Sequence, residues 1–401
     1  MEQKSSSMKY ATLRYALINI SYFAVFCGIH AYSSVFLLSK GFSNTMIGMV
    51  LAIANIMSVI CQPLVAGLID KPGPLTNRNV SMGATILMII GSLVLYFLDN
   101  AYVVIFIVYA LVYMIQMVYQ PLIIAMNFEY RKAGANINFG LSRGLGSFGF
   151  AITSVIFGRV VTERGVATIQ MLDVFLLVAS FVLLFTFALP KGTNVSAEET
   201  KIEGVAHNNF FDFARTYPRF MFLILGSVCF FFAHNVLNDF LIQIIMPIGG
   251  NEAKMGYAIF IAAALELPTM AAIGVIKKKI SCSNLLVISG IVFFVKTLIM
   301  LLATNMTMVY ISEICQLGAY ALFIPTSAYY VEEIMQELDK VKGQAYINVS
   351  ITLGGVFSNL ICGRILDKSG VFSMLSVCLA VTAMGLLIVW ISVKGGKNIS
   401  C

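Results

Sequence analysis

The chain has 401 residues, of which 59% are hydrophobic and only 11% are charged. A soluble domain has about 45–50% apolar and about 25% charged residues, so this composition excludes soluble, disordered and fibrous proteins. The apolar residues fall into runs of about 18 residues or more, the length that a helix needs to cross a bilayer core. We therefore predict an all-α, multi-pass membrane protein.

Twelve apolar segments follow one another along the chain, separated by polar turns such as Lys277-Lys278-Lys279. Their ranges are 15–38, 45–69, 80–98, 101–126, 138–162, 167–189, 220–247, 253–276, 284–303, 307–331, 343–366 and 371–393. The longest polar stretch, from Pro190 to Pro218, divides them six and six. We therefore predict an N-terminal six-helix bundle in residues 1–189, a cytoplasmic linker in residues 190–218 and a C-terminal six-helix bundle in residues 219–401.

The 26 Lys and Arg residues are unevenly divided between the two ends of the predicted helices. The N-terminus, the even-numbered loops and the C-terminus hold 18 of them, the odd-numbered loops hold six, and Arg143 and Lys296 lie inside spans. Because basic residues favour the cytoplasmic side, we expect a plasma or inner cell membrane protein with both termini in the cytoplasm. The net charge of +7 then faces anionic lipids of the bilayer, and no nucleic-acid partner is expected.

The two halves of the sequence repeat each other. The segment from Gly158 to Val166 is similar to the segment from Gly363 to Val371, which lies 205 residues later, and at the same offset Gly149 matches Gly354. Parallel repeats of six helices, related by a pseudo-two-fold axis, are the arrangement of major facilitator transporters. In that architecture the substrate site lies near the membrane midplane between the halves, and access alternates between the two sides.

Several motifs carry a resemblance to a known family. They are Gln62-Pro63-Leu64 followed by Asp70-Lys71-Pro72-Gly73, the stretch Phe139-Gly140-Leu141-Ser142-Arg143-Gly144-Leu145-Gly146, and Gly343-Gln344. With them the sequence resembles the lactose permease branch of the major facilitator superfamily, whose members are oligosaccharide:proton symporters. The similarity covers nearly the whole chain. It implies a twelve-helix transporter with a sugar site and a proton site.

The resemblance also implies roles for individual residues. Arg143 matches the Arg that binds the sugar, and Phe150, seven residues later on the same helical face, matches the Trp that stacks on the sugar ring. Lys296 falls where the branch has an Arg in helix nine. Glu266 lies in the same helix as the branch's central acid.

Other positions depart from the branch. Ala66 stands where the first Gly of the superfamily's loop signature is usual, and Asn127 lies in the neighbourhood of a missing sugar-binding acid in helix four. Gln316 and Ala319 stand where the branch has a His and a proton-carrying Glu. These departures argue against lactose as the substrate and against an unaltered coupling mechanism.

Ionisable residues at membrane depth cost roughly 2.5–3.5 kcal/mol each and are functional candidates. The deep ones are Arg143, Asp239, Glu266, Lys296 and Glu313. With three acids and two bases, one carboxyl has no fixed basic partner and can carry a proton. We expect Glu266 to be the proton site, with Lys296 and Glu313 also in proton coupling; a structural ion pair is the alternative. Lys296 is a plausible partner of Glu266, but the sequence leaves open whether it pairs with Glu266, Glu313 or Asp239. Asp173, near the outer end of helix six, is expected to meet water.

The remaining polar and aromatic residues predict a solute cavity. The expected substrate-binding residues are Arg143, Phe150, Tyr32, Asn127, Gln316 and Asp239. Glu313 and Gln316 are three residues apart and share one face of helix ten, with Tyr320 a turn further. His30 and His234, at matching depth in the two halves, are either a proton relay or, more simply, packing histidines.

These patterns favour a secondary transporter, a proton-coupled symporter of a sugar or related polyhydroxylated solute. The alternatives are a nucleoside importer or a drug:proton antiporter of the same superfamily. An enzyme is not expected, because the sequence has no H-E-x-x-H, G-x-S-x-G or Walker motif. We expect no cofactor, a small-molecule solute and protons as ligands, the lipid bilayer as surroundings, and a monomer.

Overall fold

A computed structural model describes residues 10–69, 71, 75–188 and 209–394, and their regular structure is entirely helical. Contacts divide the chain into two compact units. Unit 1 comprises Met1–Glu198 and Glu252–Phe260, and unit 2 comprises Glu199–Asn251 and Ile261–Cys401. The division into bundles 1–189 and 219–401 stays a prediction. Most of the predicted linker lies outside the described residues; its described end forms a short helix.

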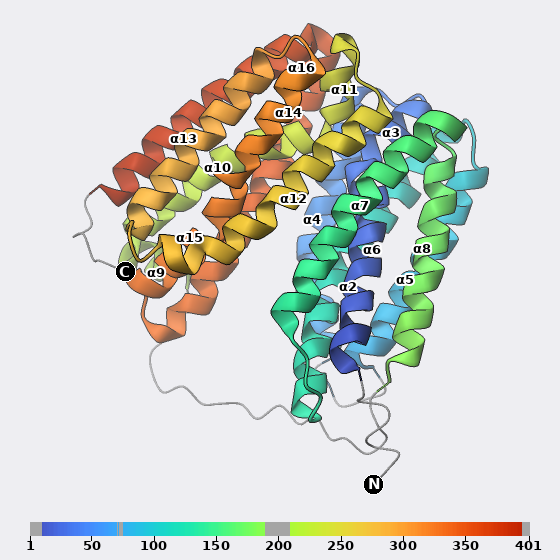
Figure 1. Cartoon of the computed structure of the whole chain (residues 1–401), viewed down its shortest axis with the longest axis horizontal. Helices are drawn as coiled ribbons and strands as arrows, with labels where there is room; N and C mark the ends of the chain where they lie inside the picture. Colours follow the sequence, from blue (N-terminus) through green and yellow to red (C-terminus); the bar gives the residue numbers. More distant parts are fainter. Residues whose placement is uncertain (1–9, 70, 72–74, 189–208, 395–401) are drawn as a thin grey trace. The chain divides into compact units, whose positions relative to one another are not determined.

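The helices of the first half are given in Figure 1. They are α2 (Ala11–Phe26), η1 (Cys27–Ala31), α3 (Ser33–Ser39), α4 (Asn44–Ile69), α5 (Asn77–Phe97), α6 (Tyr102–Lys132), α7 (Phe139–Arg164) and α8 (Thr168–Thr186). The second half contains α9 (Phe210–Thr216), α10 (Pro218–Asp239), α11 (Leu241–Ile245), η2 (Met246–Ile248), α12 (Glu252–Ile276), α13 (Cys282–Leu301), α14 (Met306–Ile314), η3 (Cys315–Leu317), α15 (Tyr320–Ile334) and α16 (Glu337–Val393).

Among the described residues, eleven helical ranges are long and apolar enough to cross a membrane. The longest, α16, contains Gly370 with φ 76°, a non-helical conformation. Ile347 and Val393 pack in one apolar cluster, although 46 residues of straight helix would hold them about 69 Å apart. The chain therefore reverses at Gly370. Division of α16 there gives twelve spans, which confirms the predicted number.

Polar turns between the spans cap the helices that follow. The side chains of Thr76, Asn138, Ser281 and Asn305 each accept a hydrogen bond from a backbone N–H in the first turn of α5, α7, α13 and α14, respectively. Such caps satisfy N–H groups that have no partner within the helix. The short turns that end one apolar run therefore also start the next helix.

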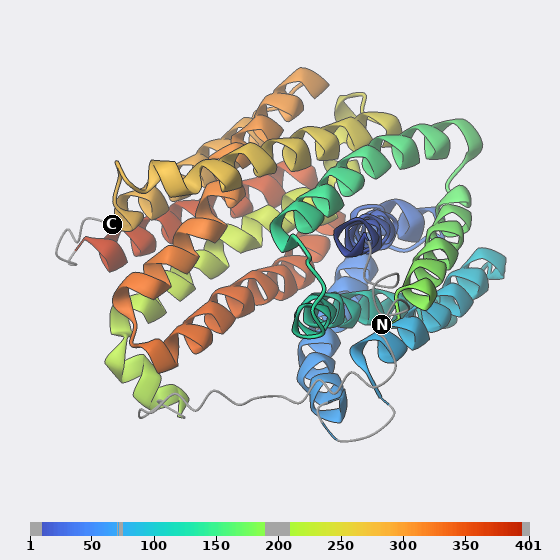
Figure 2. The same cartoon turned by 60° about the horizontal axis from the view of Figure 1, so that its bottom comes forward.

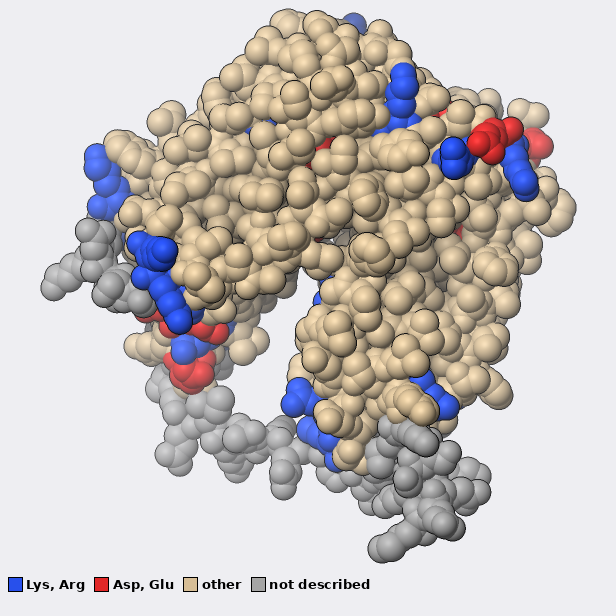
Figure 3. All heavy atoms as spheres, viewed as in Figure 1, with Lys and Arg blue, Asp and Glu red and all other residues tan. Residues whose placement is uncertain are grey.

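The flanks of the helices are apolar where they face outward. Leu64 is 61% exposed and Phe175 is 69% exposed. Exposure of such large apolar side chains is unfavourable in water but favourable in contact with lipid chains. On the face in Figure 3 the charged side chains gather near the helix ends, and the flanks between them are almost entirely uncharged. This distribution fits a protein that spans a bilayer.

In unit 1, α2 is the central helix. It packs against α7 and α8, and Figures 1 and 2 both show it (dark blue) beside these two green helices. Buried tyrosines link it to α6: the Tyr15 hydroxyl donates to the Ile123 carbonyl at 3.1 Å, and that of Tyr22 to the Gln116 carbonyl at 3.3 Å. We call α2, η1 and α3 together helix one. Helix one therefore packs against α6 and α7, the helices that carry the predicted site residues Asn127, Arg143 and Phe150.

In unit 2, α10 packs against both parts of α16, near Gly354 before Gly370 and near Gly385 after it. A Cβ added to Gly354 would lie 2.8 Å from the Phe232 backbone nitrogen, so the two backbones meet closely there. Next to this contact, the rings of Phe230 and Phe293 stack at 5.2 Å between centroids. This aromatic packing positions α13, which carries Lys296.

Candidate functional site

The central feature of unit 2 is a buried ion pair. The Lys296 Nζ atom of α13 lies 2.8 Å from Glu313 Oε2 of α14, and the two side chains are only 2% and 4% exposed. Lys296 also donates to Gln316 Oε1 at 2.8 Å. A buried ammonium needs this kind of coordination, because an isolated charge in an apolar interior is very costly.

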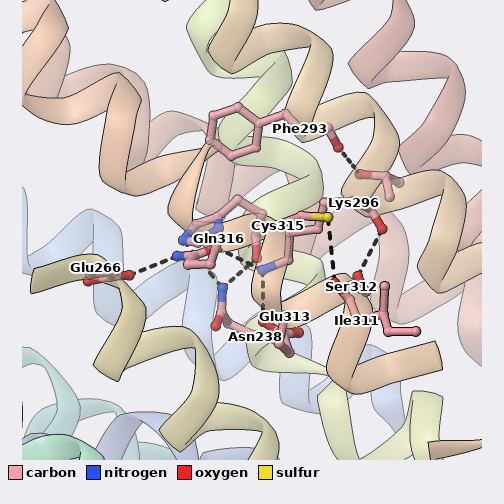
Figure 4. Close-up of polar contacts among 11 residues, drawn as sticks. Asn238, Glu266, Phe293, Lys296, Ile311, Ser312, Glu313, Cys315 and Gln316 are labelled. Carbon is pink, nitrogen blue, oxygen red and sulfur yellow. Dashed lines mark hydrogen bonds and ion pairs between the residues drawn. The ribbon is translucent and has the colours of Figure 1, made fainter. Parts of the chain in front are cut away.

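Gln316 extends the ion pair to a second carboxyl. Its Nε2 donates to Glu266 Oε1 of α12 at 2.8 Å, while its Oε1 accepts from Lys296 (Figure 4). The expected direct pair between Lys296 and Glu266 is therefore wrong in this structure. Glu313 is the ion-pair partner, and Glu266 joins the group through the neutral amide. We call Glu266, Lys296, Glu313 and Gln316 the buried charge group.

The helix that supplies Glu313 and Gln316 is interrupted at this point. The α-helical turns of α14 end at Ile314, η3 is a single 3-10 turn, and Ala319 has φ −86° and ψ −98°, outside helical geometry. The Ser289 hydroxyl of α13 donates to the Ala319 carbonyl at 2.8 Å, and the Ser312 hydroxyl to the Lys296 carbonyl at 2.9 Å. Non-helical backbone at membrane depth is tolerated where neighbouring groups satisfy it, and it often marks a functional hinge.

The predicted shared face of Glu313 and Gln316 is confirmed, since both contact Lys296 Nζ. Tyr320 follows the interruption, and its ring stacks on His234 at 4.9 Å between centroids. His234 in turn has Asn238 within 3.3 Å of its Nε2 atom. The histidine of the second half therefore sits in an aromatic and amide setting, which agrees with the simpler packing interpretation.

Asp239, predicted to bind solute, lies at the last residue of α10. Its Oδ2 accepts a hydrogen bond from Asn359 Nδ2 of α16 at 2.9 Å. Asn235, expected beside it, donates instead to the backbone carbonyls of Phe231 and Ile351. Asn359 was not singled out from the sequence, because nothing in its position relative to Asp239 along the chain indicates contact.

In unit 1, Arg143 of α7 lies over the ring of Phe23, 4.0 Å from its centroid. Its Nη1 donates to Ser147 Oγ at 3.0 Å. A cleft of about 10 Å³, room for roughly one water molecule, lies beside it. The residues that line the cleft are Asn19, Tyr22, Phe23, Gln120, Ile123, Ile124 and Arg143. Phe23 was missed in the sequence, although aromatic support for a buried guanidinium is common.

Two further predicted substrate-binding residues of this half, Asn127 and Phe150, lie on α6 and α7. Phe150 is half-buried, and its ring centroid is 6.1 Å from that of Phe26, which stacks on His30 at 4.0 Å. Asn127 is buried, and neither polar atom of its side chain has a hydrogen-bond partner among the described residues. A buried amide left in this way costs about 1–3 kcal/mol, so a ligand that supplied partners would be favoured.

Tyr32 has a different place from the one expected. It is fully buried, and its hydroxyl donates to the Ser154 carbonyl of α7 at 2.7 Å. In this conformation the side chain ties helix one to α7 and offers no face to a solute. Its assignment to substrate binding stays a prediction.

Asp173 contradicts its prediction outright. The carboxyl is completely buried in α8 rather than exposed to water. It is a buried ionisable residue that the five chosen from the sequence did not include. Its position near the end of the predicted helix suggested exposure to water. In the structure the backbone of helix one at Gly28 covers the side chain.

Curated proteins of similar sequence are transporters. The uncharacterized transporter YwbF of Bacillus subtilis (strain 168) is 22% identical over 367 residues, which cover 89% of this chain and 87% of that protein. A maltose permease of Geobacillus stearothermophilus is 23% identical over 390 residues, which cover 94% and 95%. Both similarities run through nearly the whole length of each chain.

Solved structures of transporters share the fold. The nucleoside transporter NupG has a TM-score of 0.76 at 15% identity, covering 97% of this chain and all of its own. A POT family transporter in complex with a thioalcohol-conjugated peptide has a TM-score of 0.73 at 12% identity, covering 95% of each chain. The model of the MFS_1 like family matches residues 12–390. The chain therefore belongs to the MFS_1 like family and is a multi-pass membrane transporter of the major facilitator type.

Proposed function

We propose that this transporter is a proton-coupled symporter of a sugar or a related polyhydroxylated solute, working by alternating access. The observation that carries the proposal is the buried charge group, in which two carboxyls and an amide surround one ammonium. With all members ionised the group has one negative charge in excess. Uptake of one proton neutralises it, which is the property that a proton-coupled carrier needs.

Within the group, the two carboxyls have different neighbours. Glu313 contacts the Lys296 ammonium directly, whereas Glu266 contacts the neutral Gln316 amide. A nearby cation favours the ionised form of a carboxyl. Because Glu313 is committed to the Lys296 ammonium, we propose Glu266 as the carrier of the transported proton, with Gln316 linking the two carboxyls through the ammonium.

The Arg143 region supplies the proposed solute contacts. A guanidinium held over Phe23 presents fixed donors to hydroxyl oxygens, and Phe150 on the same helix is an aromatic platform for a ring face. Asn127 adds an amide with unused polar atoms. Gln316, Asp239 and Tyr32 complete the proposed set. The similarity to a maltose permease supports a sugar over other solutes.

Replacement of Glu266 by Gln tests the proton assignment. We expect E266Q to lose accumulation of solute against a gradient while keeping exchange of internal for external solute, because Gln stays uncharged through the cycle. Wild-type accumulation should likewise vanish when the proton gradient is collapsed. E337Q, at an exposed carboxyl paired with Lys340, is the matched control and should transport normally. Undiminished accumulation without a proton gradient would end the proposal.

The choice of solute is tested by uptake into cells that express the chain. Radiolabelled mono- and disaccharides are expected to accumulate, and nucleosides are not. Drug susceptibility measured in the same cells covers the antiporter alternative. Uptake of nucleosides but not sugars would change the proposed function to nucleoside import. Nucleosides are the substrate named for the structural neighbour NupG.

We also propose that the chain is a monomer in the plasma or inner cell membrane, with both termini in the cytoplasm. The orientation is supported by the excess of Lys and Arg in the termini and even-numbered loops. A C-terminal reporter that works only in the cytoplasm should be active; an inactive reporter on a normally inserted protein would reverse the orientation.

A further inference from the structure

Asp173 is a buried carboxyl that the proposed transport mechanism does not use. It is the sixth residue of α8, in the second turn of the helix, and it has no exposed surface. Among the described residues, neither of its oxygens has a hydrogen-bond partner. A polar group in that condition is costly, and a native protein that keeps one usually has a use for it.

The carboxyl fits against one particular glycine. A Cβ added to Gly28 would lie 1.9 Å from Asp173 Oδ1, 2.7 Å from its Cγ and 2.8 Å from the ring of Phe157. No side chain other than hydrogen can occupy position 28 while Asp173 stays where it is. The carboxyl therefore rests directly on the backbone of helix one.

The backbone at this contact is not ordinary α-helix. Gly28 lies in η1, a π-helical turn in which the Tyr32 N–H reaches back to the Cys27 carbonyl at 3.2 Å. The Tyr109 hydroxyl of α6 donates to the Ile29 carbonyl of the same turn at 2.8 Å. Single π-turns inside α-helices occur frequently at functional sites. Two polar side chains from different helices thus converge on this turn.

No cation among the described residues faces the carboxyl. The titratable groups whose charge would act on Asp173 are the Cys27 thiol of η1 and the Tyr109 phenol of α6, both ordinarily uncharged at neutral pH. His30 of η1 lies between the rings of Phe26 and Tyr113.

Two charged side chains on the helices packed against α8 make contacts away from Asp173. Arg159 of α7 lies 3.6 Å from Glu163, and both are exposed. Arg78 of α5 donates to the Leu184 and Phe185 carbonyls, at the far end of α8. An ionised Asp173 would thus be an isolated buried charge, the arrangement that proteins avoid by keeping the group neutral.

We propose that Asp173 is a second proton-binding site, and that its protonated carboxyl holds α8 against the π-helical turn of helix one. Protonation converts the carboxylate to a neutral acid that tolerates the dry contact with Gly28. Loss of the proton places a charge against backbone and aromatic rings, and the contact between α8 and helix one must then open. The site is independent of the proton assigned to Glu266 and does not rest on the proposed solute.

The melting temperature of the purified full-length protein, measured in detergent between pH 5 and pH 9, tests this site without a substrate. The unfolded chain releases the Asp173 proton near the ordinary aspartate range, whereas the folded chain keeps it. Stability of the wild type must therefore fall as the pH rises above that range, until the folded chain also releases the proton. We expect a loss on the order of 2 °C per pH unit relative to D173N, which has nothing to release. Parallel profiles for wild type and D173N would overturn the proposal.

Two further measurements keep the test decisive if D173N folds poorly. The infrared band of a protonated carboxyl should be present in the folded wild type at neutral pH, should persist in E266Q, and should be lost in D173S. A rise in melting temperature on adding NaCl at high pH, present in wild type but not in D173S, would instead make Na⁺ the occupant and overturn the assignment to a proton.

A double-mutant cycle tests the contact itself. G28A should lower the melting temperature of the wild type, because the new methyl group collides with the carboxyl. In D173A the same change should cost less, since Phe157 is then the main obstacle. Equal costs in both backgrounds would show that the carboxyl does not press on Gly28 in the folded protein.

Discussion

Replacing Lys296 with Met is expected to lower the free energy of unfolding by about 3–5 kcal/mol. The reason is not the loss of attraction alone. K296M leaves the Glu313 carboxylate buried with no ammonium beside it, and removes the donor to the Gln316 carbonyl oxygen. An unpaired buried charge is far less stable than either a complete pair or no charge at all. Equilibrium unfolding in mixed micelles, followed by the loss of helical signal, measures the change.

The double variant K296M/E313Q separates the two causes. Because it removes both charges, it should recover most of the stability that K296M loses. K340M is the matched control: Lys340 and Glu337 also approach within 2.6 Å, but their side chains are 28% and 69% exposed. A surface pair of this kind is worth about 0–1 kcal/mol. If K296M cost no more than K340M, the pair would contribute nothing beyond a surface contact.

The positions of the spans were predictable because the bilayer restricts them. A helix needs about twenty apolar residues to cross the bilayer, so the lengths of the apolar runs indicate where each helix begins and ends. The predicted range 45–69 became α4 (Asn44–Ile69), and 284–303 became α13 (Cys282–Leu301). Polar turns also supply the caps, which makes both ends of a helix visible in the sequence.

The interruptions of helices were not predictable in the same way. Cys27–Ala31 and Cys315–Leu317 each lie within an apolar run, yet one is a π-turn and the other a 3-10 turn. Hydropathy reports how well a segment suits lipid and carries no information about which carbonyl each N–H reaches. The backbone here is set by tertiary partners such as the Ser289 hydroxyl.

For the candidate site, the sequence identified the members of the buried charge group but not their pairing. Charge at membrane depth is rare enough to stand out in a list of residues. Whether Lys296 reaches Glu266 or Glu313 depends on the rotation of three helices about their axes, which no spacing along the chain reveals. The burial of Asp173 was not predictable for a similar reason. The position of a residue along its helix does not show which neighbouring helix covers its side chain.

Replacing Arg143 with Ala is expected to lower the affinity for solute about 10–100-fold while leaving the amount of protein in the membrane unchanged. A hydrogen bond to a charged donor contributes about 1.5–3 kcal/mol, and each 1.4 kcal/mol is a factor of ten in binding. The Phe23 ring and Ser147 already hold the Arg143 side chain in place. The guanidinium therefore loses little conformational entropy when the solute binds. Concentration dependence of uptake, corrected for surface protein, measures the loss.

The support of Arg143 can be tested apart from its charge. R143K keeps a positive charge but loses the planar fork and the flat stack on Phe23, so it should fall between wild type and R143A. F23L should weaken uptake in the same direction as R143K, because it leaves the guanidinium in place without its aromatic floor. R164A, at the exposed end of the same helix, is the matched control and should not change uptake. If R143A transported like R164A, the guanidinium would be a packing group, and the solute contacts would have to come from Asn127 and Phe150 without it.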